Sequence, residues 1–325
     1  MLLVIFGIFD LRNNRSKIHK MLTQGLSKYI TIILIRIGEE TMTAIIKDKQ
    51  FDEERALYAL RDASVENCVF AGAADGESVL KECRNIEVSD CRFSLRYPLW
   101  HVEEFDLVRS YMDGLTRAPI WYCHSGRLTN SHISGVKAVR ECTNITVTGC
   151  NILSPEFGWK SHHITIKDTV ITAEYLLFDS TDIHIERLKM KGKYSFQYVN
   201  GLTIKDSELD TKDAFWHSEN ITVENSLVKG EYLGWFSKGL TLINCHIIGT
   251  QPLCYCKDLK LINCTMDDTD LSFEYSDVEA DIKGHILSVK NPHSGYITAD
   301  SIGEIILENS VMENNCIIKT KKVLP

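Results

Sequence analysis

The sequence predicts an all-β fold, a right-handed single-stranded parallel β-helix. Three observations predict it: an octet that recurs along most of the chain, a nearly fixed period of 19 residues, and an alternation of apolar residues that is typical of strands. The reference octet is LTLINCHI at Leu240–Ile247, and seven copies in a row start 19 residues apart, from Ile145 to Leu259. Weaker copies extend the series to about thirteen coils, which indicates a repeat architecture.

Each octet predicts a short strand, a tight bend and a second short strand. Its first and third positions are apolar and mostly β-branched, with a polar residue between them. Its fifth position is mostly Asn, Asp or Gly, which tolerate the left-handed conformation of a sharp bend. The period is too short for a helix-pair repeat, which needs about 34–47 residues. Extended coils instead stack about 4.8 Å apart, and the crossover rule for parallel strands makes them right-handed.

These octets, with their aromatic half-coils, resemble those of the pectin-lyase-like right-handed β-helix superfamily. More specifically, the chain is similar to a bacterial family within it that carries only a domain-of-unknown-function label. The resemblance covers roughly Phe51 to Met312. It implies the fold and transfers no catalytic residue, because no motif of the lyases or polygalacturonases of that superfamily matches here.

The expected organisation is one elongated domain with short terminal segments. Residues 1–41 carry two apolar runs too short to span a bilayer, and we interpret them as a mis-called start or a disordered leader, with Met42 favoured as the true start. Residues 42–62 are predicted to be an N-terminal cap whose short helix over Asp52–Leu60 hides the open strand edges. The β-helix is expected over 63–312 and a frayed tail over 313–325.

Nine of the eleven cysteines fall into two ladders of small residues. Five occupy the sixth octet position and four lie three residues before an octet, where neighbouring coils carry Ser or Thr. This interchange argues against disulfides, and the spacing offers no CxxC pairing for zinc. A chain with so many unpaired thiols fits a reducing compartment. We therefore expect a cytoplasmic protein without a metal site.

Charge and motifs narrow the function classes. The net charge of −8, without a basic stripe, argues against a nucleic-acid partner, and no segment is long enough to span a membrane. The chain contains no phosphate-binding loop, nucleophile elbow, His-x-x-x-His pair or dinucleotide fingerprint, so we expect no cofactor. The oligomeric state has no sequence signal.

Two columns in the other half of each coil are candidate binding residues. The residue five before each octet is usually large, and all five tryptophans fall in this column. The next residue forms a mixed column of His, Tyr, Glu, Lys and Asp. Neighbouring strand residues point to opposite faces, so we expect one column inside and the other outside; either core filling or an outward strip on which sugars stack fits. The candidate substrate-binding residues are Trp100, His101, Trp121, Tyr122, Trp159, Tyr198, Trp216, His217 and Trp235.

Glu141, Lys160 and Asp179 are the candidate catalytic residues, on three successive coils of the mixed column. Two coils put the backbones of Glu141 and Asp179 about 9.6 Å apart, close to the 6.5–9.5 Å or so between the carboxyls of inverting glycosidases. Lys160 between them would lower both pKa values. One hypothesis is therefore a carbohydrate-binding or carbohydrate-active protein (hydrolase or lyase-like) whose partner is an oligo- or polysaccharide. The other is a non-catalytic cytoplasmic scaffold or protein-interaction solenoid.

Overall fold

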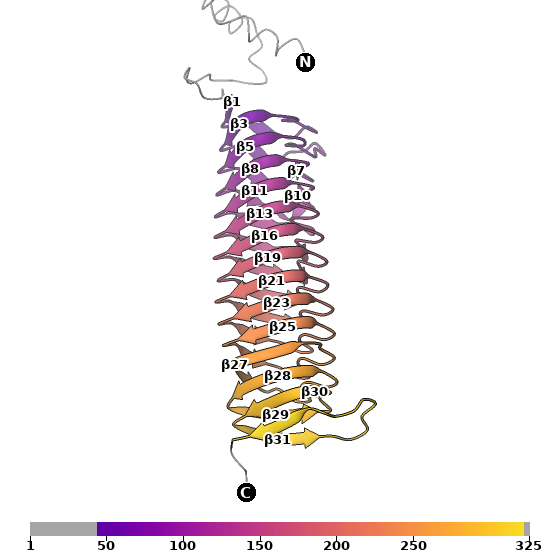
Figure 1. The fold of residues 1–325 in the computed structure, drawn as a ribbon. Coiled ribbons are helices and arrows are strands. Elements are labelled where there is room, and N and C mark those ends of the chain that lie inside the picture. The colour runs from indigo at the N-terminus through magenta and orange to yellow at the C-terminus, as the bar shows by residue number, and fades with distance from the viewer. Residues whose placement is uncertain (1–43, 322–325) are drawn as a thin grey trace, which may run out of the picture.

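The computed structural model describes residues 44–321, which form one rod of stacked coils (Figure 1). Each coil contributes one strand to a parallel first face, on which the strands point leftward while the chain descends, so the coil is right-handed (Figure 1). The predicted right-handed parallel β-helix is confirmed, with fifteen coils in the described residues where about thirteen were expected. The first-face strands are β1 (Ala44–Lys47), β3 (Arg61–Glu66), β5 (Arg84–Ser89), β8 (Glu103–Val108), β11 (His124–Thr129), β13 (Thr143–Thr148), β16 (His162–Lys167), β19 (Thr181–Glu186), β21 (Asn200–Lys205), β23 (Glu219–Glu224), β25 (Lys238–Ile243), β27 (Leu259–Asp267), β28 (Asp277–Lys283), β30 (Ser294–Ala299) and β32 (Ile317–Thr320).

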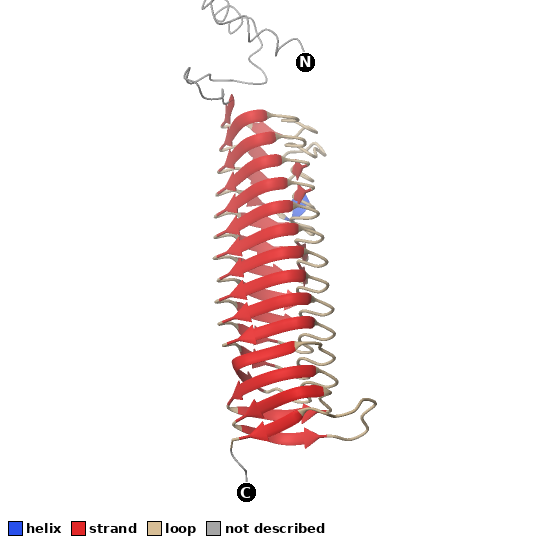
Figure 2. Ribbon diagram, in the orientation of Figure 1, coloured by secondary structure: helices blue, strands red, loops and turns tan. Residues whose placement is uncertain are grey.

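A second face of shorter strands follows the bend of each coil, and the rest of the coil consists mostly of turns (Figure 2). The second-face strands are β2 (Gln50–Phe51), β4 (Val69–Phe70), β6 (Arg92–Phe93), β9 (Tyr111–Met112), β12 (His132–Ser134), β14 (Asn151–Leu153), β17 (Val170–Ala173), β20 (Lys189–Lys193), β22 (Glu208–Lys212), β24 (Leu227–Lys229), β26 (His246–Ile248), β29 (His285–Lys290) and β31 (Ser301–Ile306). Four two-residue strands lie in the turn-rich part: β7 (Leu99–Trp100), β10 (Ile120–Trp121), β15 (Glu156–Phe157) and β18 (Tyr175–Leu176). Residues 44–321 contain a single 3-10 turn, η2 (Gly114–Thr116), and none of their helices is long and apolar enough to cross a membrane.

The 19-residue period appears directly in the strand register. Ile145 pairs with Ile164, and Ile183 pairs with Leu202, so equivalent octet positions stack along the rod. The apolar octet residues point inward, and phenylalanines from the second face stack in the core, as Phe70 does on Phe93 at 4.6 Å. Complete burial of such a side chain contributes about 1.5–3 kcal/mol. One continuous core therefore runs the length of the rod.

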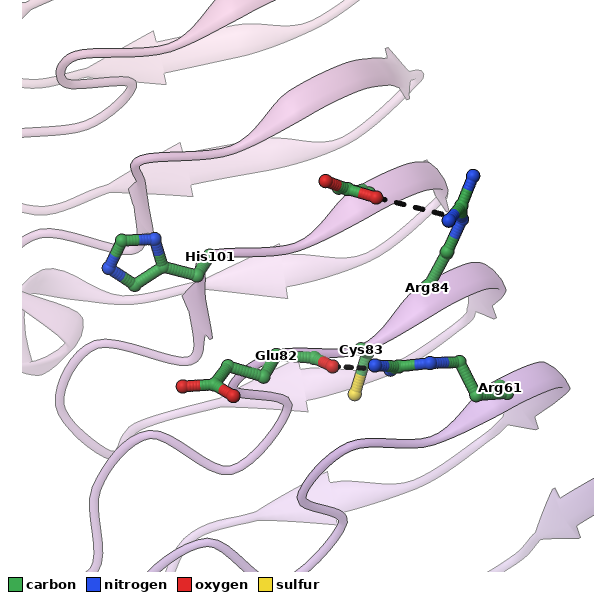
Figure 3. Close-up of a pocket in the computed structure, with 6 residues that line it drawn as sticks. Arg61, Glu82, Cys83, Arg84 and His101 are labelled. Atoms are coloured by element: carbon green, nitrogen blue, oxygen red, sulfur yellow. Dashed lines mark hydrogen bonds and ion pairs between the residues drawn. The ribbon is translucent and has the colours of Figure 1, made fainter.

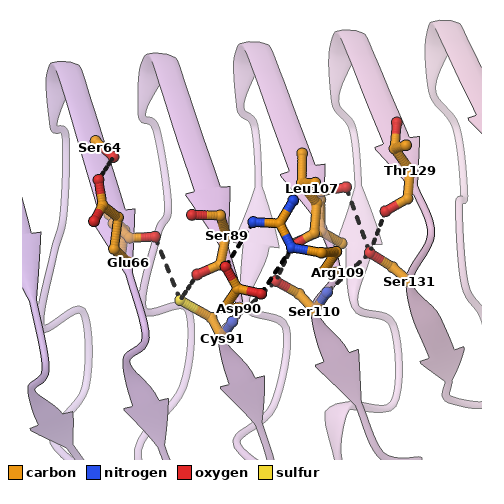
Figure 4. A network of polar contacts seen from close by, with 12 residues as sticks. Ser64, Glu66, Ser89, Asp90, Cys91, Leu107, Arg109, Ser110, Thr129 and Ser131 are labelled. Carbon is orange, nitrogen blue, oxygen red and sulfur yellow. Dashed lines mark hydrogen bonds and ion pairs between the residues drawn. The ribbon is translucent and has the colours of Figure 1, made fainter.

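The bend between the two faces is a left-handed residue followed by a small one. Asp90, for example, has a φ of 56°. The backbone N–H of Cys91, which follows it, donates to the hydroxyl of Ser110 at 3.1 Å, and the N–H of Ser110 donates to Ser131 at 3.0 Å (Figure 4). The small-residue ladder thus satisfies buried N–H groups that the bend removes from the sheet. Cysteine fills the same role, since the N–H of Cys68 donates to the sulfur of Cys91 at 3.4 Å.

The predicted N-terminal capping helix is wrong. Residues 52–60 are turns that complete the first described coil, and Arg55 and Ala59 have left-handed φ values of 53° and 56°. The N–H of Arg55 donates to the carbonyl of Glu77 and that of Leu57 to the carbonyl of Val79, both in the next coil. These bonds along the rod replace the bonds within a helix that the local sequence favoured. Residues 1–41, the predicted leader, lie outside the described residues.

The predictions for the last two octet copies and for a frayed C-terminal tail are also wrong. The copy at Ala280 is displaced, because Ala280 pairs with Leu261, the third octet position, and a bulge follows in β27. The copy at Ile305 lies on the second face, where it pairs with Val289. The first-face strand of that coil is β30, which pairs with β32. The predicted tail over 313–325 therefore contains a strand of the solenoid.

Candidate functional site

The mixed column forms the second corner of ten successive coils. Its members all have left-handed φ values, between 51° and 59°. We call it the corner column: Glu82, His101, Tyr122, Glu141, Lys160, Asp179, Tyr198, His217, Phe236 and Tyr255. The expectation that this column and the tryptophan column face opposite ways is wrong, because a left-handed residue interrupts strand alternation. The tryptophans are half-buried, the corner side chains are exposed or half-buried, and the small residue that follows each corner is buried inside.

The tryptophan column is a half-buried layer of stacked rings. Trp100 stacks on Trp121 with ring centroids 5.4 Å apart, and Trp216 stacks on Trp235 at 5.5 Å. The indole N–H of Trp216 donates to the carbonyl of Tyr232 at 2.7 Å, which fixes its ring against the next coil. These contacts are those of structural aromatics whose outer edges reach the surface.

Four rings of the corner column form what we call the exposed ring stack: Tyr198, His217, Phe236 and Tyr255. Successive centroids lie 5.1, 5.0 and 4.8 Å apart, and the ring planes differ by at most 18°. Tyr198 is 49% exposed and Phe236 is 43% exposed. His101 and Tyr122 form a shorter stack of the same kind, at 5.0 Å.

The stacking decides what these rings offer to a ligand. Within the exposed ring stack, neighbouring rings cover one another's faces, so the ring edges point outward. A sugar that binds an aromatic strip lies on ring faces, and the inner rings, His217 and Phe236, have none free. The hydroxyls of Tyr198 and Tyr255 and the imidazole nitrogens of His217 have no hydrogen-bond partner in the described residues. The exposed ring stack therefore presents apolar ring edges to the solvent, together with the polar hydroxyl and imidazole groups at their ends.

The three candidate catalytic residues lie between the two ring stacks, in what we call the polar window. Glu141 accepts a hydrogen bond from Nε of Arg140 at 3.1 Å. Its hydrogen bond with Tyr122 raises the pKa of that phenol. Within residues 44–321, Lys160 and Asp179 form no ion pair with each other or with other side chains. The three residues share one column as expected, and Lys160 does not bridge the two carboxylates.

Arg140 is a residue of this region that the sequence did not single out. It takes the place of a tryptophan in its column and lies 5.6 Å from the ring centre of Trp159. It also forms an ion pair with Glu156, at 3.6 Å. The guanidinium of Arg140 therefore links the carboxylates of Glu141 and Glu156. The sequence signal that could have identified Arg140 is its position in the tryptophan column, where other coils carry a large aromatic residue.

A pocket of about 240 Å³ lies at the N-terminal end of the corner column (Figure 3). Its charges are largely paired: Nη1 of Arg61 donates to the Glu82 carbonyl and Arg84 forms an ion pair with Glu103 at 3.6 Å. Burial raises the pKa of the Cys83 thiol to about 11, so it is no thiolate nucleophile at neutral pH. Of the predicted binding residues, only His101 lies here. The lining residues are Arg61, Glu82, Cys83, Arg84, His101 and Glu103.

The described residues contain no group of three or more His, Cys, Asp or Glu side chains that could hold a metal ion. All eleven cysteines are free. Burial raises the pKa of several of them, Cys256 to about 11 among them. The thiols therefore serve as small interior groups that take part in the hydrogen-bond ladders.

The family described as "Protein of unknown function (DUF3737)" matches residues 44–319, which is most of the chain and nearly all of the described rod. This chain belongs to the DUF3737 family. The match agrees with the resemblance to a family that carries only a domain-of-unknown-function label. No curated protein matches the sequence.

Solved structures similar to this DUF3737 chain are repetitive β proteins. The AlgE4 A-module, a mannuronan C-5 epimerase from Azotobacter vinelandii, is 8% identical over 85% of this chain and 87% of its own, with a TM-score of 0.30. The catalytic domain of a GH87 alpha-1,3-glucanase is 8% identical over 86% and 64%, with a TM-score of 0.29. HetL, a pentapeptide repeat protein from the cyanobacterium Nostoc sp., is 9% identical over 70% and 89%, with a TM-score of 0.24. Such scores carry no argument about activity.

Proposed function

We propose that this DUF3737 protein is a non-catalytic solenoid that binds another protein along the exposed ring stack. The observation that carries the proposal is the stack itself: rings from four coils have outward edges, and their polar tips have no hydrogen-bond partner in the described residues. Exposed Tyr and Phe side chains that form a continuous patch are typical of protein interfaces. A rigid ring also loses little conformational entropy when a partner covers it.

Two features favour a protein partner over a sugar and binding over catalysis. Ring edges pack well against apolar side chains, whereas sugar stacking needs the ring faces that the neighbouring coils cover. A general acid or base needs a carboxyl group that can reach the substrate, whereas the Glu141 carboxylate is held by Nε of Arg140 at 3.1 Å. Asp179 forms no ion pair or side-chain hydrogen bond within residues 44–321, and the polar window then acts as a charged border of the binding surface.

Site-specific photocrosslinking tests this proposal. A benzophenone side chain placed at Tyr198 or Phe236 should give a discrete crosslinked protein in cells. Tyr111 is the matched control, since it is 40% exposed and stacks on His132 at 4.8 Å on another face of the rod. For the identified partner, Phe236→Ala should weaken binding by roughly tenfold or more, as hot-spot aromatics do. Equal crosslinking from Tyr111, or none from either test position, would remove the proposal.

A second candidate function, saccharide binding at the polar window, rests on Tyr122. Within the described residues, the rings that contact Tyr122 belong to His101 and Trp121, and the next coil carries Glu141 at this corner in place of a further ring. A sugar could stack there and reach Lys160 and Asp179. A thermal-shift screen with a broad saccharide panel tests this, with Tyr122→Ala as the variant that should abolish any shift. Turnover lost in both Glu141→Gln and Asp179→Asn would make the site catalytic, while no response to any saccharide favours the protein partner.

A further inference from the structure

The C-terminal end of the described rod exposes two strand edges. β31 pairs with β29, and β32 pairs with β30. In the described chain neither strand has a second neighbour, whereas first-face strands inside the rod pair on both sides. A free edge presents backbone N–H and C=O groups that another strand can pair with.

Exposed apolar residues are concentrated at the same end. Seven of the seventeen exposed large apolar side chains lie between residues 287 and 317, and Val311, in the loop that projects beside β31, is 85% exposed (Figure 1). Single exposed apolar residues are normal on a protein surface, but a cluster at an open strand edge marks an interaction surface. The seven are Leu287, Tyr296, Ile305, Leu307, Val311, Met312 and Ile317.

The two free edges carry opposite charges. Glu304 on β31 and Lys319 on β32 are both exposed and have no ion-pair partner in the described residues. Lys321, directly after β32, lies 3.2 Å from Asp300 of its own copy, so its charge is already paired. An acidic edge and a basic edge at one end of a rod complement those of a second copy.

We propose that two copies of this chain join end to end, with β31 of each copy pairing antiparallel with β32 of the other. The chain passes through β31 toward the projecting loop and returns through β32 in the opposite direction (Figure 1). A two-fold axis parallel to these strands therefore brings each β31 beside an oppositely directed β32. Such an interface is self-complementary, as two-fold contacts require.

Charge selects this arrangement over the other two-fold arrangement. Pairing β32 with its own equivalent would put both Lys319 side chains in one seam and both Glu304 side chains in the other, and like charges across an interface are costly. The proposed pairing places Glu304 of one copy near Lys319 of the other, twice. It also brings Ile305 and Ile317, exposed in the single copy, to the same seam.

Sedimentation equilibrium of the full chain tests the proposal. The wild type should dimerise, and Glu304→Lys or Lys319→Glu alone should weaken self-association by roughly tenfold or more, because each creates two like-charge contacts. An equimolar mixture of the two variants should recover dimers, since each junction is then oppositely charged. Glu219→Lys and Lys191→Glu, exposed positions without ion pairs in the middle of the rod, should leave the dimer unchanged.

Hydrogen exchange gives a readout that does not depend on the variants. Amides of β31 and β32 should become more protected as the wild-type concentration rises, while those of β19 and β21 should not change. A wild type that stays monomeric would mean that Lys319 only protects a free edge, and the proposal would be overturned. A dimer that both single variants leave intact, or a mixture that stays monomeric, would also overturn it.

Discussion

The backbone N–H of Ser110 donates to the hydroxyl of Ser131, one coil further along the rod, at 3.0 Å. The Ser131 hydroxyl in turn donates to the carbonyl of Thr129 at 3.0 Å. Both serines are buried. One small side chain therefore serves the backbone of two coils, and this explains why the ladder takes Ser, Thr or Cys.

Ser131→Ala should therefore destabilise the rod by about 1–3 kcal/mol, the cost of leaving a buried N–H without a partner. Urea unfolding followed by circular dichroism measures this. Ser125→Ala is the control, because Ser125 is exposed and forms no hydrogen bond through its side chain in the described residues. Equal effects of the two changes would contradict a role for the ladder.

Cys245→Ser and Cys264→Ser should each cost less than about 1–2 kcal/mol, since only a small polarity cost remains. The Cys264 thiol donates to the Leu242 carbonyl at 3.3 Å, and the Cys245 thiol donates to the Val223 carbonyl at 3.4 Å. A serine hydroxyl can make the same bonds. Melting temperatures of the two variants check this, and a loss of the folded state in either would show that sulfur volume, not hydrogen bonding, is essential there.

All eleven cysteines should titrate as free thiols when the protein is denatured without reductant. They are free in the structure, and we propose a reducing, cytoplasmic location on that basis. Ellman titration in guanidinium measures the number. Four or more blocked thiols would contradict the proposed location.

Asp90 and Arg109 should make stability depend on pH at the acidic end. Nη2 of Arg109 donates to Oδ2 of Asp90 at 2.7 Å, and this hydrogen bond lowers the pKa of Asp90. Because the folded-state pKa is the lower one, the contribution is present above the unfolded-state pKa and is lost as pH falls through the folded-state pKa. Arg109→Gln should raise the pKa of Asp90 in an NMR titration. The stability gap between wild type and variant should be present at neutral pH and close in acid; a gap that does not change with pH would rule out the ion pair as its cause.

The period, the strand register and the first bend were predictable because, in most coils, each of these features needs the same type of residue at the same position. The fifth octet position needs a left-handed residue, and Asn225, Asn244 and Asn263 reveal it. The second corner needs the same conformation but carries residues such as Tyr198 and Phe236, so composition does not reveal it. The false helix at Asp52–Leu60 has the same origin, since bonds between coils override local propensity.

The candidate site was predictable only as a set of columns. Trp100, Trp121 and their equivalents do share one column, and the corner residues share the next. Which side they face depends on the backbone angle at a single residue per coil. Pairing of Glu141 with Arg140, its chain neighbour, could not be predicted from the column spacing.

The left-handed corner places one outward side chain per coil at a fixed spacing along the rod. Each corner side chain points away from the packed interior, so its chemistry can change without disturbing the coil that holds it, provided that the backbone angle is tolerated. Corner side chains of successive coils are about 4.8 Å apart. Each coil contacts mainly its neighbours. Removal of one 19-residue coil between Tyr122 and Tyr198 would therefore shorten the distance between the two ring stacks by one coil spacing and leave each stack intact. The distance between two binding features on this molecule is therefore set in steps, by a number of coils.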